Sequence, residues 1–116
     1  MQYIILAPEF AVCKIKDIKE VDFSRAFVFL SKTNEEISLV CEADCVPAGV
    51  ISIEKGWRAF RVAGVLDFGL VGIIAKITAV LAEAGISVFV VSTFDTDYVL
   101  LKSQDFDRGL GLLTNS

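Results

Sequence analysis

Hydroxyl and carboxylate side chains stand between two apolar segments in the C-terminal part of the chain. Ser92, Thr93, Asp95 and Asp97 fall within six consecutive residues, whereas the segments on either side are apolar. Hydroxyl oxygens accept hydrogen bonds and carboxylates attract cations, so this segment is suited to hold an ammonium group. Asp and Thr are also ordinary turn residues, and a turn without any ligand is the alternative interpretation.

A second candidate lies upstream, where a long amphipathic helix is predicted to begin. Apolar residues from Leu70 to Ala84 recur at helical spacing, Asp67 is placed as the N-cap, and Gly85 is placed to end the helix. The start of a helix offers free backbone N–H groups and the positive end of its dipole, which favour a carboxylate. Gly72 would let a ligand approach the backbone closely.

These two segments are expected to lie at the same end of one sheet. In a split βαβ arrangement, the segment 64–71 leads from a strand into the helix, and the turn 92–97 joins the next two strands. The turn then emerges beside the start of the helix. A free amino acid carries an ammonium and a carboxylate group on one carbon, so such a zwitterion fits between the two segments.

The elements that must position these segments predict an α+β fold. Strands are expected at 10–15, 26–31, 37–41, 57–62, 86–91 and 98–102, and a second helix at 105–113. The β-α-β-β-α order of the second half is typical of a ferredoxin-like unit, an antiparallel sheet with helices on one face. The first half has a more irregular order, and two such units in tandem could build one continuous sheet. Residues 54–56 are the expected junction.

Length and composition set limits on the class of protein. The 116 residues suffice for one compact domain or for two very small units that share a core. The hydrophobic fraction is 54% and the mean hydropathy is +0.63, which is more apolar surface than a small core readily hides. We therefore expect a homodimer. No apolar run reaches the roughly 18 residues of a membrane span, so a soluble chain without a membrane partner is expected.

Charge and targeting signals narrow the partners further. The net charge is -4, and no stretch concentrates basic residues, which disfavours nucleic-acid binding. The N-terminal residues lack the basic and apolar regions of a signal peptide, so a cytoplasmic protein is expected.

Catalytic and metal chemistry find little support in the residue types. The chain has no histidine, which removes His-based triads and the most common metal ligand. Cys41 and Cys45 lie four residues apart, but a structural zinc site needs four ligands and the only further cysteine is Cys13, so we expect core packing of free thiols. Asp95 and Asp97 lack a nucleophile or base partner. We expect no enzyme, metal or cofactor.

The segment from Gly56 to Leu101 resembles ACT domain proteins related to the regulatory region of aspartate kinase. The similarity is greatest to the small tandem-ACT proteins and to the cytosolic arginine sensors. It is carried by GWRAFRV and LDFGLVGIIAKITAVLAEAGISVFVVSTFDTDYVLL, which contain the Gly72-Ile73-Ile74 helix start, the AGI element at 84–86 and the STF-x-x-D turn at 92–97. The similarity extends weakly to residues 45–50.

The resemblance implies a βαββαβ fold with two ACT units in each chain, which often dimerise and bind small amino acids between units. It divides this chain into a degenerate N-terminal unit, 1–56, and a C-terminal ACT domain, 57–116. The ligand-contact residues that it implies are Asp67, Phe68, Gly72, Ile73, Thr93, Phe94 and Asp97. Among them Asp97 is the expected partner for a cationic group.

Two departures from the family pattern affect these expectations. The arginine sensors have an acidic residue shortly before the glycine at the helix start, where this chain has Leu70 and Val71, so arginine specificity is not expected. Similar proteins also continue into a final strand after the second helix. Here either that strand is lost or the first half of the chain completes the sheet.

The sequence therefore predicts a regulatory protein that binds a small amino acid without catalysis, works as a dimer, and acts on a protein partner that the sequence does not identify. The ligand would bridge two units and bias their packing. The alternative is a self-association module without a ligand, in which the apolar excess alone explains the chain.

Overall fold

The fold was determined as a computed structural model, which describes residues 2–63 and 72–115. The chain forms two compact units, each described separately below. The α/β unit comprises Met1–Ala7 and Arg58–Ser116, and the strand unit comprises Pro8–Trp57. Two long strands, β1 (Tyr3–Ile15) and β4 (Ser52–Val62), contribute residues to both units.

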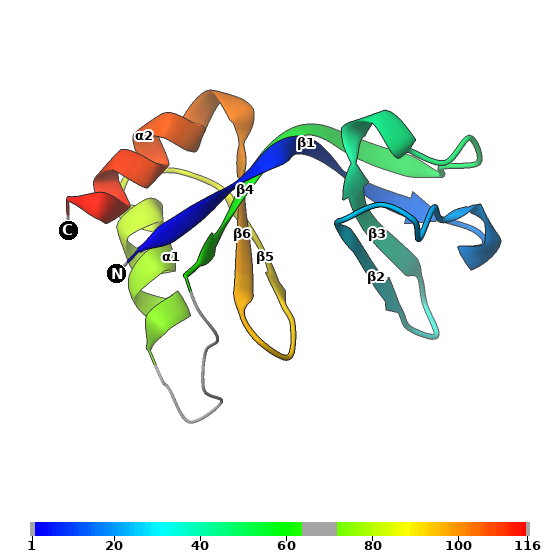
Figure 1. Cartoon of the computed structure of the whole chain (residues 1–116), viewed down its shortest axis with the longest axis horizontal. Coiled ribbons are helices and arrows are strands. Elements are labelled where there is room, and N and C mark those ends of the chain that lie inside the picture. The colour runs from blue at the N-terminus through cyan, green and yellow to red at the C-terminus, as the bar shows by residue number, and fades with distance from the viewer. Residues whose placement is uncertain (1, 64–71, 116) are drawn as a thin grey trace. The chain divides into compact units, whose positions relative to one another are not determined.

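The α/β unit has two helices and a four-stranded antiparallel arrangement (Figure 1). Besides parts of β1 and β4, it contains α1 (Ile73–Glu83), β5 (Val88–Ser92), β6 (Asp97–Lys102) and α2 (Ser103–Thr114). The predicted strands and helices of this half are confirmed, with ends shifted by a few residues. The second helix forms in spite of its two glycines.

The N-terminal segment completes the sheet of the α/β unit. Its strands are ordered β1-β4-β6-β5, so residues 3–7 of β1 occupy the edge position beside β4. The backbone N–H of Ala63 donates to the carbonyl of Gln2 at 2.9 Å. Of the two alternatives for the final strand of a βαββα chain, the second is therefore correct: the first half of the sequence supplies it.

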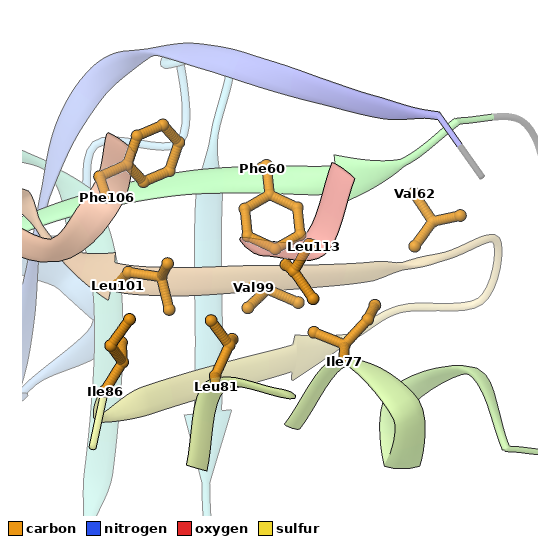
Figure 2. Packing of buried hydrophobic residues seen from close by; sticks show 9 residues of the cluster. All are labelled: Phe60, Val62, Ile77, Leu81, Ile86, Val99, Leu101, Phe106 and Leu113. Atoms are coloured by element: carbon orange, nitrogen blue, oxygen red, sulfur yellow. The ribbon is translucent and has the colours of Figure 1, made fainter. Parts of the chain in front are cut away.

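The core of the α/β unit lies between the helices and one face of its strands (Figure 2). Its members come from both helices, β4, β6 and the connection between α1 and β5; they are Phe60, Val62, Ile77, Leu81, Ile86, Val99, Leu101, Phe106 and Leu113. Phe60 and Val62 share a face of β4, as the period-two pattern predicts. Each fully buried large aliphatic side chain contributes about 1.5–3 kcal/mol.

Glycines define both ends of α1. Gly72 has φ 86° and occupies the cap position, so the helix begins at Ile73, later than the predicted cap at Asp67 implies. The predicted cap, Asp67, lies outside the described residues. At the other end, Gly85 has φ 72°, and the N–H of Ile86 donates to the carbonyl of Leu81 at 3.0 Å. This is the left-handed termination that the sequence predicts.

The strand unit has an equivalent strand order but no long helices. Its elements are parts of β1 and β4 with η1 (Ile18–Glu20), β2 (Val28–Lys32), β3 (Ile37–Glu42) and η2 (Ala43–Cys45), and its strands are ordered β2-β3-β1-β4. Read in the reverse direction, its order β4-β1-β3-β2 corresponds to β1-β4-β6-β5 in the α/β unit. Two single 3₁₀ turns therefore stand where the α/β unit has α1 and α2. The predicted hairpin of β2 and β3 is confirmed. The predicted junction at 54–56 lies inside the continuous strand β4, close to the boundary between the two units after Trp57.

The two hairpins have equivalent registers 60 residues apart. Val28 pairs with Cys41 and Lys32 with Ile37 in one hairpin, just as Val88 pairs with Leu101 and Ser92 with Asp97 in the other. Both loops contain four residues and start with threonine. The first loop residue donates its N–H to the carbonyl of the last at 2.9 Å in the strand unit and 2.8 Å in the α/β unit.

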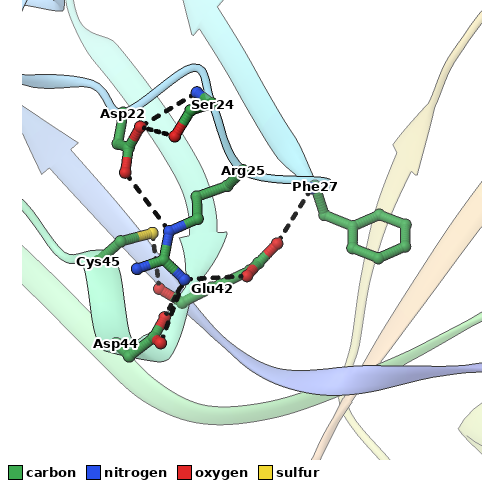
Figure 3. A network of polar contacts seen from close by, with 7 residues as sticks. All are labelled: Asp22, Ser24, Arg25, Phe27, Glu42, Asp44 and Cys45. Atoms are coloured by element: carbon green, nitrogen blue, oxygen red, sulfur yellow. Dashed lines mark hydrogen bonds and ion pairs between the residues drawn. The ribbon is translucent and has the colours of Figure 1, made fainter.

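A polar network ties the segment before β2 to the end of β3 (Figure 3). The Arg25 guanidinium lies 3.4 Å from Asp22, 3.5 Å from Glu42 and 3.0 Å from Asp44. The other carboxylate oxygen of Glu42 accepts the backbone N–H of Phe27 at 3.1 Å. Hydrogen bonds from Ser24, followed by Arg25, lower the pKa of the exposed Asp22 carboxyl. We assign this network a structural role, because it spans two irregular segments.

The apolar core of the strand unit contains the cysteines. Ala11, Cys13, Ile15, Leu39 and Cys41 are buried, and Cys45 packs against them. All three thiols are free, and Cys41 contacts both of the others. Burial, followed by the neighbouring thiols Cys13 and Cys45, raises the pKa of Cys41 well above its ordinary value of 9.0.

These thiols predict a loss of stability in alkali. Because the folded-state pKa of Cys41 is raised, the folded chain holds this proton more tightly than the unfolded chain does, and stability is lost as pH rises above the unfolded pKa. We expect the unfolding free energy to fall above pH 9 by about 1.4 kcal/mol per pH unit for each such thiol. Urea titrations from pH 7.5 to 10.5 under reducing conditions measure it. Cys41→Ala should make the slope shallower, and an identical slope would contradict the assignment.

Candidate functional site

The turn between β5 and β6 carries the acidic residues singled out by the sequence. Ser92 ends β5 and pairs directly with Asp97, which begins β6. The Ser92 hydroxyl donates a hydrogen bond to the Asp97 carboxylate. Asp97 is half-buried, whereas Asp95 is exposed. The Asp97 carboxylate is therefore held in place by Ser92, and it keeps acceptor positions for a further donor.

Two threonines shape the interior of this turn. The Thr93 hydroxyl lies 3.1 Å from the carbonyl oxygen of Thr96 and 3.4 Å from its backbone nitrogen. The Thr93 N–H also donates to the Thr96 carbonyl at 2.8 Å. The Thr93 hydroxyl thus forms its hydrogen bonds within the turn. This agrees with the alternative that part of this segment serves turn geometry.

Thr96 connects the turn to the end of β4. Its hydroxyl donates to the carbonyl of Val62 at 3.3 Å, and its side chain is only 7% exposed. Val62 is the last residue of β4, so the chain leaves β4 next to this turn. The described chain therefore leaves β4 beside this turn, and the segment 64–71 lies outside the described residues.

The start of α1 lies at the same end of the α/β unit. Ile77, one turn after the first helical residue Ile73, packs in the same cluster as Val62. Figure 2 shows these two side chains at the end of the cluster that is nearest the β5–β6 turn. Gly72 stands at the cap position and has no side chain that could bond the first N–H groups of the helix.

The structure places five of the seven predicted ligand-contact residues at this end. Gly72 is exposed and Ile73 half-buried at the helix start, and Thr93 and Asp97 belong to the turn. Phe94, at the tip of the turn, is 80% exposed. Asp67 and Phe68 lie outside the described residues.

The sequence pattern does not single out Thr96. Residue type and spacing point to the carboxylates on either side of it, Asp95 and Asp97. The single usable signal was a β-branched hydroxyl residue at the end of a turn. Its partner is a backbone carbonyl 34 residues earlier in the chain, and local sequence patterns carry no information about such a contact.

The residue types at this end suit recognition by hydrogen bonds and charge. A hydroxyl-supported carboxylate suits an ammonium group, and backbone N–H groups at a helix start suit a carboxylate. Among the described residues, no group of three or more Cys, Asp or Glu side chains is arranged to hold a metal ion. In the same residues, no helix has the length and apolar character that crossing a membrane requires.

A family comparison assigns this architecture. Residues 52–115, more than half of the chain, match the model of the ACT domain. The chain belongs to the ACT domain family. ACT domains are regulatory modules that generally bind small ligands and often form oligomers, which places this ACT domain protein among regulatory rather than catalytic domains.

Solved structures agree with this ACT fold. The protein Atu0741 from Agobacterium tumefaciens is 31% identical, with a TM-score of 0.83 over 97% of this chain and 86% of that one. Aspartate kinase from Clostridium acetobutylicum is 18% identical, with a TM-score of 0.66 over 94% of this chain and 33% of that one. A structure described as a putative C-terminal regulatory domain of aspartate kinase from Porphyromonas gingivalis is 17% identical, with a TM-score of 0.59 over 98% and 96%. No curated protein sequence matches this ACT domain protein significantly.

Proposed function

We propose that this ACT domain protein is a non-catalytic sensor of a free amino acid, which it binds between the start of α1 and the β5–β6 turn. The residues assigned to the ligand are Asp67, Phe68, Gly72, Ile73, Thr93, Phe94 and Asp97. The ligand is a zwitterion, with its ammonium group at Asp97 and its carboxylate at the helix start.

The observation that carries this proposal is the position of Asp97. Its carboxylate is half-buried and accepts a hydrogen bond from Ser92, in a turn that Thr96 joins to the end of β4. A carboxylate fixed in this way loses little side-chain entropy when it binds an ammonium group. The helix start supplies the complementary charge preference at the same end of the α/β unit.

We further propose that the chain is a tandem of two ACT-like units along the sequence, with residues 1–56 as a degenerate first unit whose initial segment contributes a strand to the α/β unit. Support comes from the equivalent hairpin registers 60 residues apart and from the equal strand order of the two units. The short turns η1 and η2 then stand for the two helices of a complete unit. In this proposal arginine is not the ligand, because the chain has Leu70 and Val71 where the arginine sensors have an acidic residue.

The protein acts in the cytoplasm as a homodimer in this proposal. The 80% exposed ring of Phe94 is an apolar surface beside the site that a second copy or a ligand would cover. The ligand signals by binding one arrangement of two units more tightly than another, and a further protein reads the result.

Calorimetric titration with each of the twenty amino acids tests the proposed function. At least one amino acid is expected to bind the intact protein. Asp97→Asn should weaken that binding about tenfold to hundredfold, because a charged hydrogen bond contributes about 1.5–3 kcal/mol. Asp95→Asn is the matched control. It removes the same charge from an exposed side chain that lies two residues before Asp97.

The outcomes separate the sensor from the association module. Absence of heat with all twenty amino acids would favour a self-association module without ligand. Equal binding by the Asp97→Asn and Asp95→Asn proteins would leave a sensor whose ammonium partner is not Asp97.

A further inference from the structure

We infer that Thr96 is a positioning residue, whose buried hydroxyl holds the β5–β6 turn, and with it Asp97, against the end of β4. This inference rests on the proposed function for its consequence, ligand affinity. Its geometric part concerns only the turn and β4.

The burial of this hydroxyl calls for an explanation. Thr96 is 7% exposed at the end of a four-residue loop whose other three residues, 93–95, are all exposed. Its hydroxyl lies 3.3 Å from the Val62 carbonyl on a different strand. A buried hydroxyl is costly unless it is hydrogen-bonded, so this contact fixes where the turn lies relative to β4.

The strand unit provides an internal control for the turn itself. At the equivalent place 60 residues earlier stands Glu36, which is exposed. That loop closes with the same backbone hydrogen bond, from Thr33 to Glu36 at 2.9 Å, although it has no hydroxyl at its last position. A four-residue turn of this kind therefore forms without a threonine at its end, and the Thr96 hydroxyl is left to orient the turn.

Asp97 is the residue that this orientation affects. It follows Thr96 directly, and its carboxylate already accepts from Ser92 on the opposite strand. With both strands held, the carboxylate has one direction in which to meet a ligand. Loss of the Thr96 contact frees the turn to move about the ends of β5 and β6. The Asp97 carboxylate then samples a wider range of orientations.

Replacement of Thr96 by valine is a mild change to the fold. Valine has nearly the same shape as threonine, and the Val62 carbonyl keeps a second donor, because Arg61 Nη1 lies 3.2 Å from it. No buried carbonyl is therefore stripped of all partners. Thr96→Ser keeps the hydroxyl and is the conservative variant that should restore the contact.

The test combines a readout of the turn with a readout of binding. Amide hydrogen exchange should be about tenfold faster at Thr93 in Thr96→Val than in the wild type, because one tie of about 1.4 kcal/mol is lost locally, with α2 unchanged. Thr96→Ser should exchange like the wild type. Thr114→Val is the control, since it removes an exposed hydroxyl that bonds the Gly111 carbonyl at 3.1 Å.

The binding arm uses an equimolar mixture of the twenty amino acids as the probe in a thermal shift measurement. The mixture should stabilise the wild type, Thr96→Ser and Thr114→Val, and Thr96→Val should lose most of that shift. Unchanged exchange at Thr93 in Thr96→Val overturns the inference, as does an intact shift in that variant. A wild type that the mixture does not stabilise contradicts the proposed function, and the exchange arm still decides whether Thr96 holds the turn.

Discussion

Removal of residues 1–7 is expected to unfold the α/β unit. These residues occupy the edge position beside β4, where the Tyr3 ring packs edge-on against Phe60 with centroids 5.2 Å apart. The deletion also removes Leu6, which is 5% exposed, and leaves one side of β4 without a partner. Burial of one such side chain contributes about 1.5–3 kcal/mol, and the loss of a whole strand exceeds that several-fold. A small domain has only about 5–15 kcal/mol to lose.

A permuted chain is the matched control for this deletion. Residues 2–7 joined behind Asn115 by a short Gly/Ser linker should restore the fold, because the segment then follows α2 as the last strand of a ferredoxin-like unit does. Amide spectra of α1 and α2 report the outcome. A deletion variant with wild-type signals in both helices would show that the N-terminal strand is dispensable.

Alanine substitution at the two glycines of α2 is expected to act in opposite directions. A Cβ at Gly109 would lie 2.7 Å from Leu101 Cδ1 and 3.2 Å from Leu81 Cδ2. Both leucines are fully buried, so a shift of either side chain would displace its neighbours in the packed core. Gly109→Ala should therefore destabilise the protein by about 1–3 kcal/mol through overpacking, in spite of its better helix propensity.

Gly111 is the control for this substitution within the same helix. A Cβ there would meet nothing within 4 Å. Gly111→Ala should stabilise the protein by about 0.5–1 kcal/mol, because alanine loses less backbone entropy than glycine in a helix. Thermal or urea unfolding measures both changes. Two changes of the same sign would contradict the close approach of α2 to β6 at Gly109.

The contrast between these glycines shows what the sequence could predict about α2. The spacing of Phe106, Leu110 and Leu113 predicts the helix, and propensity alone treats both glycines as weaknesses. Their difference depends on how close Leu81 and Leu101 lie, which is a tertiary distance. The local pattern predicts the helix, whereas tertiary packing decides how each glycine within it affects stability.

The same limit explains the outcome for the strands. Periodicity predicts the hairpins and the long helix, because each of these is closed by neighbours in the sequence. Periodicity does not reveal that residues 3–7 pair beside β4, since that contact spans more than fifty residues. The strand also comes before the strand unit in the sequence, although it belongs to the α/β unit that follows. The start of α1 was misplaced because a glycine at positive φ leaves no hydrophobic signal.

The candidate site divides along the same line. Residue type and spacing identify the turn 92–97, and the β5–β6 register places Ser92 opposite Asp97 as a hairpin requires. Thr96 was overlooked because its partner is a backbone atom of Val62. Chemistry that depends on side-chain type can be read from the sequence, whereas support from a distant carbonyl cannot.

The proposed function requires that one amino acid is held between the start of α1 and the β5–β6 turn. Backbone amide shifts, followed while each of the twenty amino acids is added, measure such binding residue by residue. We predict that one or a few amino acids shift the signals of Gly72, Ile73, Thr93, Phe94 and Asp97, and leave the equivalent turn at 33–36 unchanged. Shifts confined to other parts of the chain, or none with any amino acid, would contradict this account.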